Sequence, residues 1–349
     1  MKSINSVVLL LLTACVLLVP LCALPKNGAK AALKTSADYN FAASTGSTRE
    51  AAGSGTDASV KTQSSAKATS AKVSGQSTVR MYDVATKKIT ELSMHDYIFG
   101  VVAGECPMLY HNEAIKAQIV AARTYALFRM NENKDKEYDV TNEPQTSQTY
   151  ITKQTALKNW GAAAEQYSKK LEELLKSVEN EAVLYKDKPI LAVYHAISSG
   201  KTESCKNVWG SDYPYLQPVE SIGDKLATNY LSECVKTEEQ ANALLKSIGI
   251  NAAQLSRAKL TKTASGNVLK VAVDGKEITG PKIVEIFNLR SQNYDITFKN
   301  KKLTITVRGY GHQAGMSQNG ANYMANDGAS YKEILQHYYQ GTTVEKYPK

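Results

Sequence analysis

The sequence has few of the residues that build cross-linked or metal-centred proteins. It contains five cysteines and five histidines in 349 residues. Cys15 and Cys22 lie in an apolar N-terminal stretch, which leaves Cys106, Cys205 and Cys234. An odd number of remaining cysteines excludes a disulfide framework, although a single Cys205–Cys234 pair stays open beside the simpler expectation of free thiols.

Other absences narrow the class of protein further. The sequence has no internal repeat, no arginine-rich cluster and no nucleic-acid-binding motif, so nucleic acid is excluded as a partner. A metal hydrolase using His195, Cys205, Cys234 and His312 would lack both the CxxC and the HExxH spacing. The net charge of +9 nevertheless favours a polyanionic partner, either anionic lipid or a cell-wall polymer.

The N-terminal 78 residues predict export rather than folding. After Met1-Lys2-Ser3, residues 7–24 form an almost uncharged apolar run, which predicts a single uncleaved membrane anchor over residues 1–24. A cleaved signal peptide, or lipidation at Cys15, are the alternatives, and all three place the rest of the chain outside the cytoplasm. Residues 25–78 are rich in Ala, Ser, Thr, Gly and Lys and predict a flexible tether.

The folded domain is expected over residues 79–349, with helices and hairpins segregated along the chain. This pattern predicts an α+β fold around a substrate cleft. The local signals include the Asp274-Gly275 hairpin turn, Pro281 at a helix start and two capping-box patterns. The predicted hairpins and strands are 79–84 with 89–92, 182–196, 267–278, 294–298 and 303–308, and the predicted helices begin at Ser93, Asn112, about 156, Thr237 and Ser330.

Glu105 stands at an unusual place, between Gly104 and Cys106-Pro107, where an apolar helix is expected to end. The negative end of the helix dipole and the loss of water both disfavour the carboxylate and raise its pKa. A carboxyl group that stays protonated near neutral pH is suited to general acid catalysis. The alternative is an exposed loop glutamate with an ordinary pKa.

Two further segments combine polar and small residues. RGYGHQAGMSQNGAN, residues 308–322, places His312, Ser317 and Gln318 among glycines between a predicted strand and helix, without a phosphate-loop or dinucleotide pattern. HAISSGKTES, residues 195–204, precedes Trp209 and the Tyr213-Pro214-Tyr215 stretch, a mixture that suits sugar recognition. A tight structural connection and a solvated loop are the respective alternatives.

The three segments together resemble the stage II sporulation protein D family, whose Gly-Glu-x-Pro motif matches GECP. The resemblance covers roughly residues 80–345, with the motifs in the family order. It implies a membrane-anchored lytic transglycosylase that cleaves peptidoglycan glycan strands during forespore engulfment, on the outer side of the mother-cell membrane. It also implies two partners, the amidase/endopeptidase stage II sporulation protein P and the membrane scaffold stage II sporulation protein M.

The resemblance further implies that Glu105 is the catalytic acid. A lytic transglycosylase needs only one carboxyl group, because the nucleophile is the sugar's own C6 hydroxyl. The residues expected to bind the glycan and the transition state are Ser199, Thr202, Glu203, His312, Ser317 and Gln318, with Tyr125 either lining the cleft or belonging to the core.

The sequence departs from family patterns at two points. Some clostridial members have a zinc site, a His and two Cys, before a Gln-x-Tyr; here Gln148 and Tyr150 are present without those ligands, so neither zinc nor another cofactor is expected. Cys106 replaces the usual Met of the motif, and a cysteine nucleophile with His111 or His312 as its base finds no support in a local signature. A glycan-binding protein without catalysis remains the alternative function.

Overall fold

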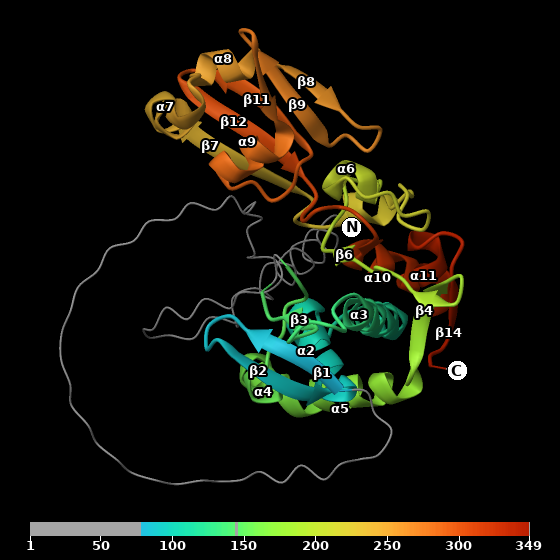
Figure 1. The fold of residues 1–349 in the computed structure, drawn as a ribbon. Coiled ribbons are helices and arrows are strands. Elements are labelled where there is room, and N and C mark those ends of the chain that lie inside the picture. Colours follow the sequence, from blue (N-terminus) through green and yellow to red (C-terminus); the bar gives the residue numbers. More distant parts are fainter. Residues whose placement is uncertain (1–77, 144–145, 349) are drawn as a thin grey trace, which may run out of the picture. The chain divides into compact units, whose positions relative to one another are not determined.

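The computed structural model describes residues 78–143 and 146–348, so the predicted anchor and tether lie outside the described residues apart from Thr78. In the described part of the chain, no helix is long and apolar enough to span a bilayer. Helices and mainly antiparallel sheets alternate in groups, which confirms the α+β class (Figure 1). The buried apolar side chains form two separate clusters, named here the first core and the second core.

The first core is built around helix α3, which is buried on nearly all sides. Its alanines let neighbouring elements approach closely, and α2, α5, α10, α11 and β4 all contact it. The sequence predicted only a single apolar stripe on this helix. The elements of the first core are β1 (Thr78–Asp83), β2 (Lys88–Ser93), α2 (Met94–Glu105), α3 (Asn112–Glu132), β3 (Val140–Thr141), α4 (Lys153–Trp160), η3 (Gly161–Ala163), α5 (Ala164–Ser177), β4 (Glu181–Tyr185), β5 (Lys188–Pro189), β6 (Tyr194–His195), α6 (Cys205–Trp209), η4 (Ile222–Leu226), β13 (Met316–Ser317), α10 (Gln318–Asn326), α11 (Tyr331–Tyr338) and β14 (Thr343–Lys346).

The second core lies within residues 231–308, between the second and third sequence motifs. Two three-stranded antiparallel sheets, ordered β10-β9-β8 and β11-β12-β7, supply its strands, and helices α7, α8 and α9 contact β7, β11 and β9 (Figure 1). The elements are β7 (Leu231–Thr237), α7 (Glu238–Leu245), η5 (Lys246–Ile248), α8 (Ala252–Ser256), β8 (Lys259–Lys262), β9 (Val268–Val273), β10 (Lys276–Thr279), α9 (Gly280–Phe287), β11 (Tyr294–Lys299) and β12 (Lys302–Arg308).

Local signals in the sequence placed most element boundaries correctly. The Ser93 hydroxyl caps α2 by accepting from the Asp96 N–H group at 3.0 Å, and Thr237 and Ser330 form the capping boxes of α7 and α11. The Asp274-Gly275 turn has positive φ at both residues, as a tight hairpin requires.

One expectation needs correction. The helix expected over 156–178 is broken, because Gly161 has a φ of +55° and ends α4 before α5 begins. Pro281 lies in the first turn of α9, which begins at Gly280, so the helix start predicted there is confirmed. Cys205 and Cys234 are free thiols, which confirms the simpler of the two expectations for this pair.

Candidate active site

Glu105 is the last residue of α2, and its side chain is partly buried. Loss of water on burial raises the pKa of its carboxyl group, while hydrogen bonds from Thr149 act in the opposite direction. The raised pKa agrees with the expectation from the sequence, and desolvation is its principal cause. The group is therefore a weaker acid than an exposed glutamate.

Two hydrogen bonds from distant parts of the chain hold Glu105. The Thr149 N–H group donates to the Glu105 Oε1 atom at 2.7 Å. The Gln318 Nε2 atom, at the start of α10, donates to the Glu105 backbone carbonyl at 3.2 Å. The first and third sequence motifs therefore meet at this residue.

A polar network involving buried tyrosines lies beside the acid. The Gln148 side chain donates from Nε2 to the Tyr97 hydroxyl and the Ala122 carbonyl, each at 3.3 Å, and its Oε1 atom accepts from the Tyr194 hydroxyl at 2.9 Å. Burial raises the pKa of the Tyr97 and Tyr194 hydroxyls, so both stay neutral hydrogen-bonding groups. The network fixes the residue that precedes Thr149.

The second and third motifs are joined by a short parallel pair of strands. Strand β6 pairs with β13, which aligns Tyr194 with Met316 and His195 with Ser317. The Tyr194 side chain reaches Gln148, whereas Gln318 follows directly on β13 and reaches Glu105. All three motifs singled out in the sequence thus converge near the acid.

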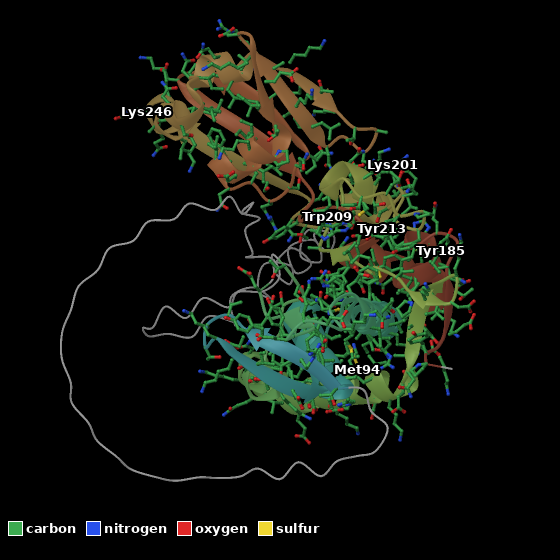
Figure 2. All side chains as sticks on the ribbon, in the orientation of Figure 1. Met94, Tyr185, Lys201, Trp209, Tyr213 and Lys246 are labelled. Atoms are coloured by element: carbon green, nitrogen blue, oxygen red, sulfur yellow. The ribbon has the colours of Figure 1, made fainter. Side chains whose placement is uncertain are left out.

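His195 and His312 form a pair of imidazoles next to an exposed tryptophan. Their ring centroids lie 5.7 Å apart, and the His312 centroid lies 4.7 Å from that of Trp209. Burial lowers the pKa of His195 to about 4 and that of His312 to about 3, so both rings are neutral at pH 7. Trp209, which is 44% exposed, and the neighbouring Tyr213 lie between β6 and β7 in the chain (Figure 2).

Three of the expected glycan-binding residues make hydrogen bonds within the chain. The Ser199 hydroxyl donates to the Ser265 carbonyl at 2.8 Å, and the Thr202 hydroxyl accepts from the Val219 N–H group at 2.8 Å. Glu203 is 1% exposed. Its Oε2 atom accepts from the Thr263 hydroxyl at 2.6 Å. These contacts connect the second motif with the β8–β9 turn, and a role in glycan binding stays a prediction.

Of the remaining expected site residues, one contacts Glu105 and two make hydrogen bonds elsewhere in the chain. Gln318 contacts Glu105 directly, as described above. Tyr125 is 8% exposed, and its hydroxyl donates to the Thr146 carbonyl at 3.4 Å. The Ser317 hydroxyl is fully buried and donates to the Asp224 Oδ1 atom at 2.7 Å.

Sequence reasoning missed four residues of this arrangement. Gln148 was noted only as part of a Gln-x-Tyr pattern, and Thr149 and Tyr194 gave no signal of their own. Asp224 is fully buried, and its Oδ2 atom accepts hydrogen bonds from the hydroxyls of Ser198 and Ser221. The sequence does not reveal that these serines surround Asp224, because the partners lie up to 93 residues apart along the chain.

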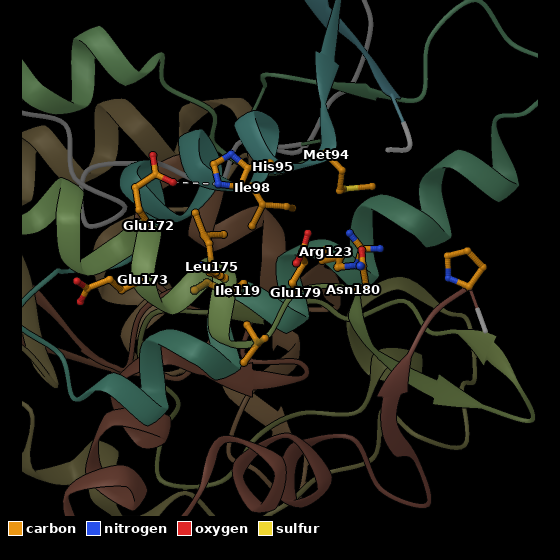
Figure 3. Close-up of a pocket in the computed structure, with 13 residues that line it drawn as sticks. Met94, His95, Ile98, Ile119, Arg123, Glu172, Glu173, Leu175, Glu179 and Asn180 are labelled. Atoms are coloured by element: carbon orange, nitrogen blue, oxygen red, sulfur yellow. Dashed lines mark ion pairs between the residues drawn. The ribbon is translucent and has the colours of Figure 1, made fainter. Parts of the chain in front are cut away.

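A cavity of about 510 Å³ lies at the opposite end of α2 from Glu105. Met94, Ile98, Leu175 and other apolar residues line it, with Arg123 beside Glu179 (Figure 3). His95 and Glu172 form an ion pair at 3.0 Å on its wall. In residues 78–143 and 146–348 no cluster of three His, Cys, Asp or Glu side chains is arranged to hold a metal ion.

Known proteins are similar to this chain over the region that contains Glu105. The sequence profile of a family described as Stage II sporulation protein matches residues 82–185, which include Glu105 and Thr149. Stage II sporulation protein D of Bacillus amyloliquefaciens is 33% identical, covering 77% of this chain and 78% of the relative. The protein of the same name from Bacillus subtilis is 32% identical, covering 83% and 87%. The amidase enhancer of Bacillus subtilis is 28% identical, over 71% of this chain and 40% of that protein. The chain belongs to the stage II sporulation protein D family, which has a role in sporulation.

Proposed function

We propose that this protein is a lytic transglycosylase that cleaves the glycan strands of peptidoglycan, with Glu105 as acid and then base. The observation that carries the proposal is the position of Glu105 at the end of α2, where burial raises the pKa of its carboxyl group and the Thr149 N–H group donates to it at 2.7 Å.

The proposed reaction uses one proton carrier. Neutral Glu105 protonates the glycosidic oxygen that leaves C1 of the muramyl sugar, and the C1–O bond breaks through an oxocarbenium-like transition state. The resulting carboxylate accepts the proton of the C6 hydroxyl on the same sugar, while O6 bonds to C1 and closes a 1,6-anhydro ring. No water is consumed, and the glutamic acid is regenerated.

The protonation state of Glu105 sets the expected pH dependence. The protonated carboxyl is the active form, so cleavage proceeds below the pKa of Glu105 and falls as pH rises through it. Because burial raises that pKa, the active form persists to higher pH than it would for an exposed glutamate.

The cluster of His312, His195 and Trp209 supports recognition of a sugar ring. The half-exposed indole offers an apolar face for a pyranose ring, the neutral His312 ring lies beside it, and the buried His195 ring packs against His312. We place the glycan along this cluster, leading toward Glu105. The net charge of +9 would keep the domain near anionic wall polymers.

The cellular setting belongs to the same proposal. We infer that the chain acts during engulfment at the outer face of the mother-cell membrane, anchored by residues 1–24, together with stage II sporulation proteins P and M. The similarity to the amidase enhancer of Bacillus subtilis also fits a protein that works beside another wall enzyme. Glycan binding without cleavage is the second candidate, since the buried hydroxyls of the second motif can shape a groove without reaching the acid.

Product analysis tests the proposal directly. The full-length chain is incubated with glycan strands stripped of stem peptides, and the released fragments are analysed by mass spectrometry. New 1,6-anhydro ends support a transglycosylase, whereas new reducing ends identify a hydrolase and contradict it. Unchanged strands that still co-sediment with the protein indicate a binding protein. EDTA is added in parallel, and loss of cleavage there would point to metal chemistry instead.

A further inference from the structure

Helix α2 has a glycine groove on the side that faces residues 149–151. A Cβ atom at Gly100 would lie 2.4 Å from the Ile151 carbonyl oxygen, and one at Gly104 would lie 3.3 Å from Thr149 Cγ2. The Ile151 N–H group donates to the Gly100 carbonyl at 3.3 Å. The two glycines, one helical turn apart, let this segment lie directly against the end of α2.

The segment delivers Thr149 to the carboxyl group of Glu105. Thr149 is 5% exposed. Its N–H group donates to Oε1 at 2.7 Å, and its side-chain hydroxyl is close enough to the same carboxyl to lower the pKa of that group. Hydrogen bonds to a carboxylate are charge-assisted and shorter than neutral ones, so this pair of donors interacts more strongly with the ionised acid than with the neutral acid.

Gln148 fixes the segment from the other side. Its amide uses both ends, because Nε2 donates to Tyr97 and Ala122 while Oε1 accepts from Tyr194. Gln148 is 4% exposed and cannot turn without leaving these buried groups unpaired. The peptide between Gln148 and Thr149 is thereby held in one orientation, with its N–H group directed at Glu105.

We propose that Thr149 is a second functional residue of the site, a two-donor clamp on the Glu105 carboxyl that Gln148 positions. The proposal rests on the assignment of Glu105 as the acid and deepens it. The clamp favours the carboxylate that forms when the proton leaves for the glycosidic oxygen, and so it assists proton donation. It then holds the carboxylate in place until the C6 hydroxyl returns a proton, and no covalent bond to Thr149 forms or breaks.

The test compares Thr149→Val with Thr149→Ser and with Thr146→Val in the full-length chain. Valine keeps the N–H group and the shape but removes one donor, serine keeps both donors, and Thr146 bonds Thr141 and Glu143 instead. The pKa of Glu105 is measured by ¹³C NMR titration of carboxyl-labelled glutamate, with Glu105→Gln identifying the signal. We expect Thr149→Val to raise that pKa by on the order of one unit. Thr149→Ser and Thr146→Val should leave it within a few tenths.

Cleavage of glycan strands provides the second readout. In Thr149→Val the fall in rate at high pH should move upward by the same amount, and the plateau rate should drop about tenfold. Gln148→Met should also move the fall in cleavage rate to higher pH. A lower rate with an unmoved pH profile and an unchanged pKa would overturn the clamp. If the wild-type chain released no anhydro ends while the pKa still rose, the clamp would stand and the proposed reaction would fail.

Discussion

The two cores of this protein follow different rules. In the first core, fully buried polar groups include His195, Glu203 and Asp224, and the partly buried Glu105 has a raised pKa. Among the described residues 231–308, the buried polar side chains are Ser265, Asn267, Ser291 and Asn293, and none is a carboxylate or an imidazole. Burying an ionisable group lowers stability unless it is well paired, so such groups accumulate where function requires them. The contrast agrees with the placement of the proposed active site in the first core.

The largest effect is expected for Glu105→Gln, which should remove the activity proposed for the first core. The amide keeps the shape and still accepts from Thr149, but it carries no acidic proton. We expect release of anhydro ends to fall about 10²–10⁴-fold, the usual range for loss of a general acid. Glu233→Gln, an exposed site on β7 in the second region, is the matched control and should cleave normally. Near-normal turnover in Glu105→Gln would remove the acid from the mechanism.

Asp224→Ala tests whether the buried carboxylate of the first core contributes more to stability than an exposed one in the second region. The change leaves the hydroxyls of Ser198, Ser221 and Ser317 without their buried acceptor, and should lower the free energy of unfolding by about 3–5 kcal/mol. Asp295→Ala in the second region removes two partly exposed ion pairs, with Lys262 and Arg308, and should cost less than about 2 kcal/mol. Urea titration measures the free energy of unfolding of both variants. Equal losses would contradict the role of Asp224 as a buried hydrogen-bond acceptor.

The buried imidazoles give the first core a pH dependence that the second region, which has no histidine, cannot share. The pKa values of His195 and His312 are lowered to about 4 and about 3, so the unfolded chain takes up protons first as pH falls below 6.5. Stability is therefore complete above pH 6.5 and declines toward pH 4, by on the order of 2 kcal/mol per imidazole at pH 5. The fall in Tm from pH 7 to pH 5 should shrink in His195→Gln; an identical fall would contradict the assignment.

The smallest effect is expected for a substitution in the second region, at Gly275. Gly275 has a φ of +76° in the β9–β10 turn, and a Cβ atom there would meet no neighbour within 4 Å. Gly275→Ala should therefore cost only the backbone strain, about 1 kcal/mol, measured as a small drop in Tm. Cleavage of glycan strands should be unchanged, and a clear loss of activity would mean that the second region takes part in catalysis.

The same contrast explains what the sequence could predict. Elements in the second region follow short-range signals such as the Asp274-Gly275 turn and the helix start at Thr237, and these predictions were correct. The break at Gly161 was missed because a helical pattern continues on both sides of a residue that has left-handed backbone geometry. Glu105 was found because its position at a helix end is itself a local signal.

The support of the acid was not predictable in the same way. Thr149, Tyr194 and Asp224 act through partners 44, 46 and up to 93 residues away, and single residues carry no mark of such pairing. Thr202 and Glu203 were assigned to glycan contact because small polar residues beside aromatic ones suit sugar recognition. The structure buries them and uses their oxygens to connect the second motif with other segments.

The hydrogen bond between Gln318 and Glu105 joins residues 213 positions apart. It follows that a growing chain cannot complete the surroundings of Glu105 until Gln318, 213 residues further along, has been made. A chain truncated before position 318 would retain the glutamate but lack this brace. Order of synthesis would thus delay assembly of the proposed active site until α10 is present.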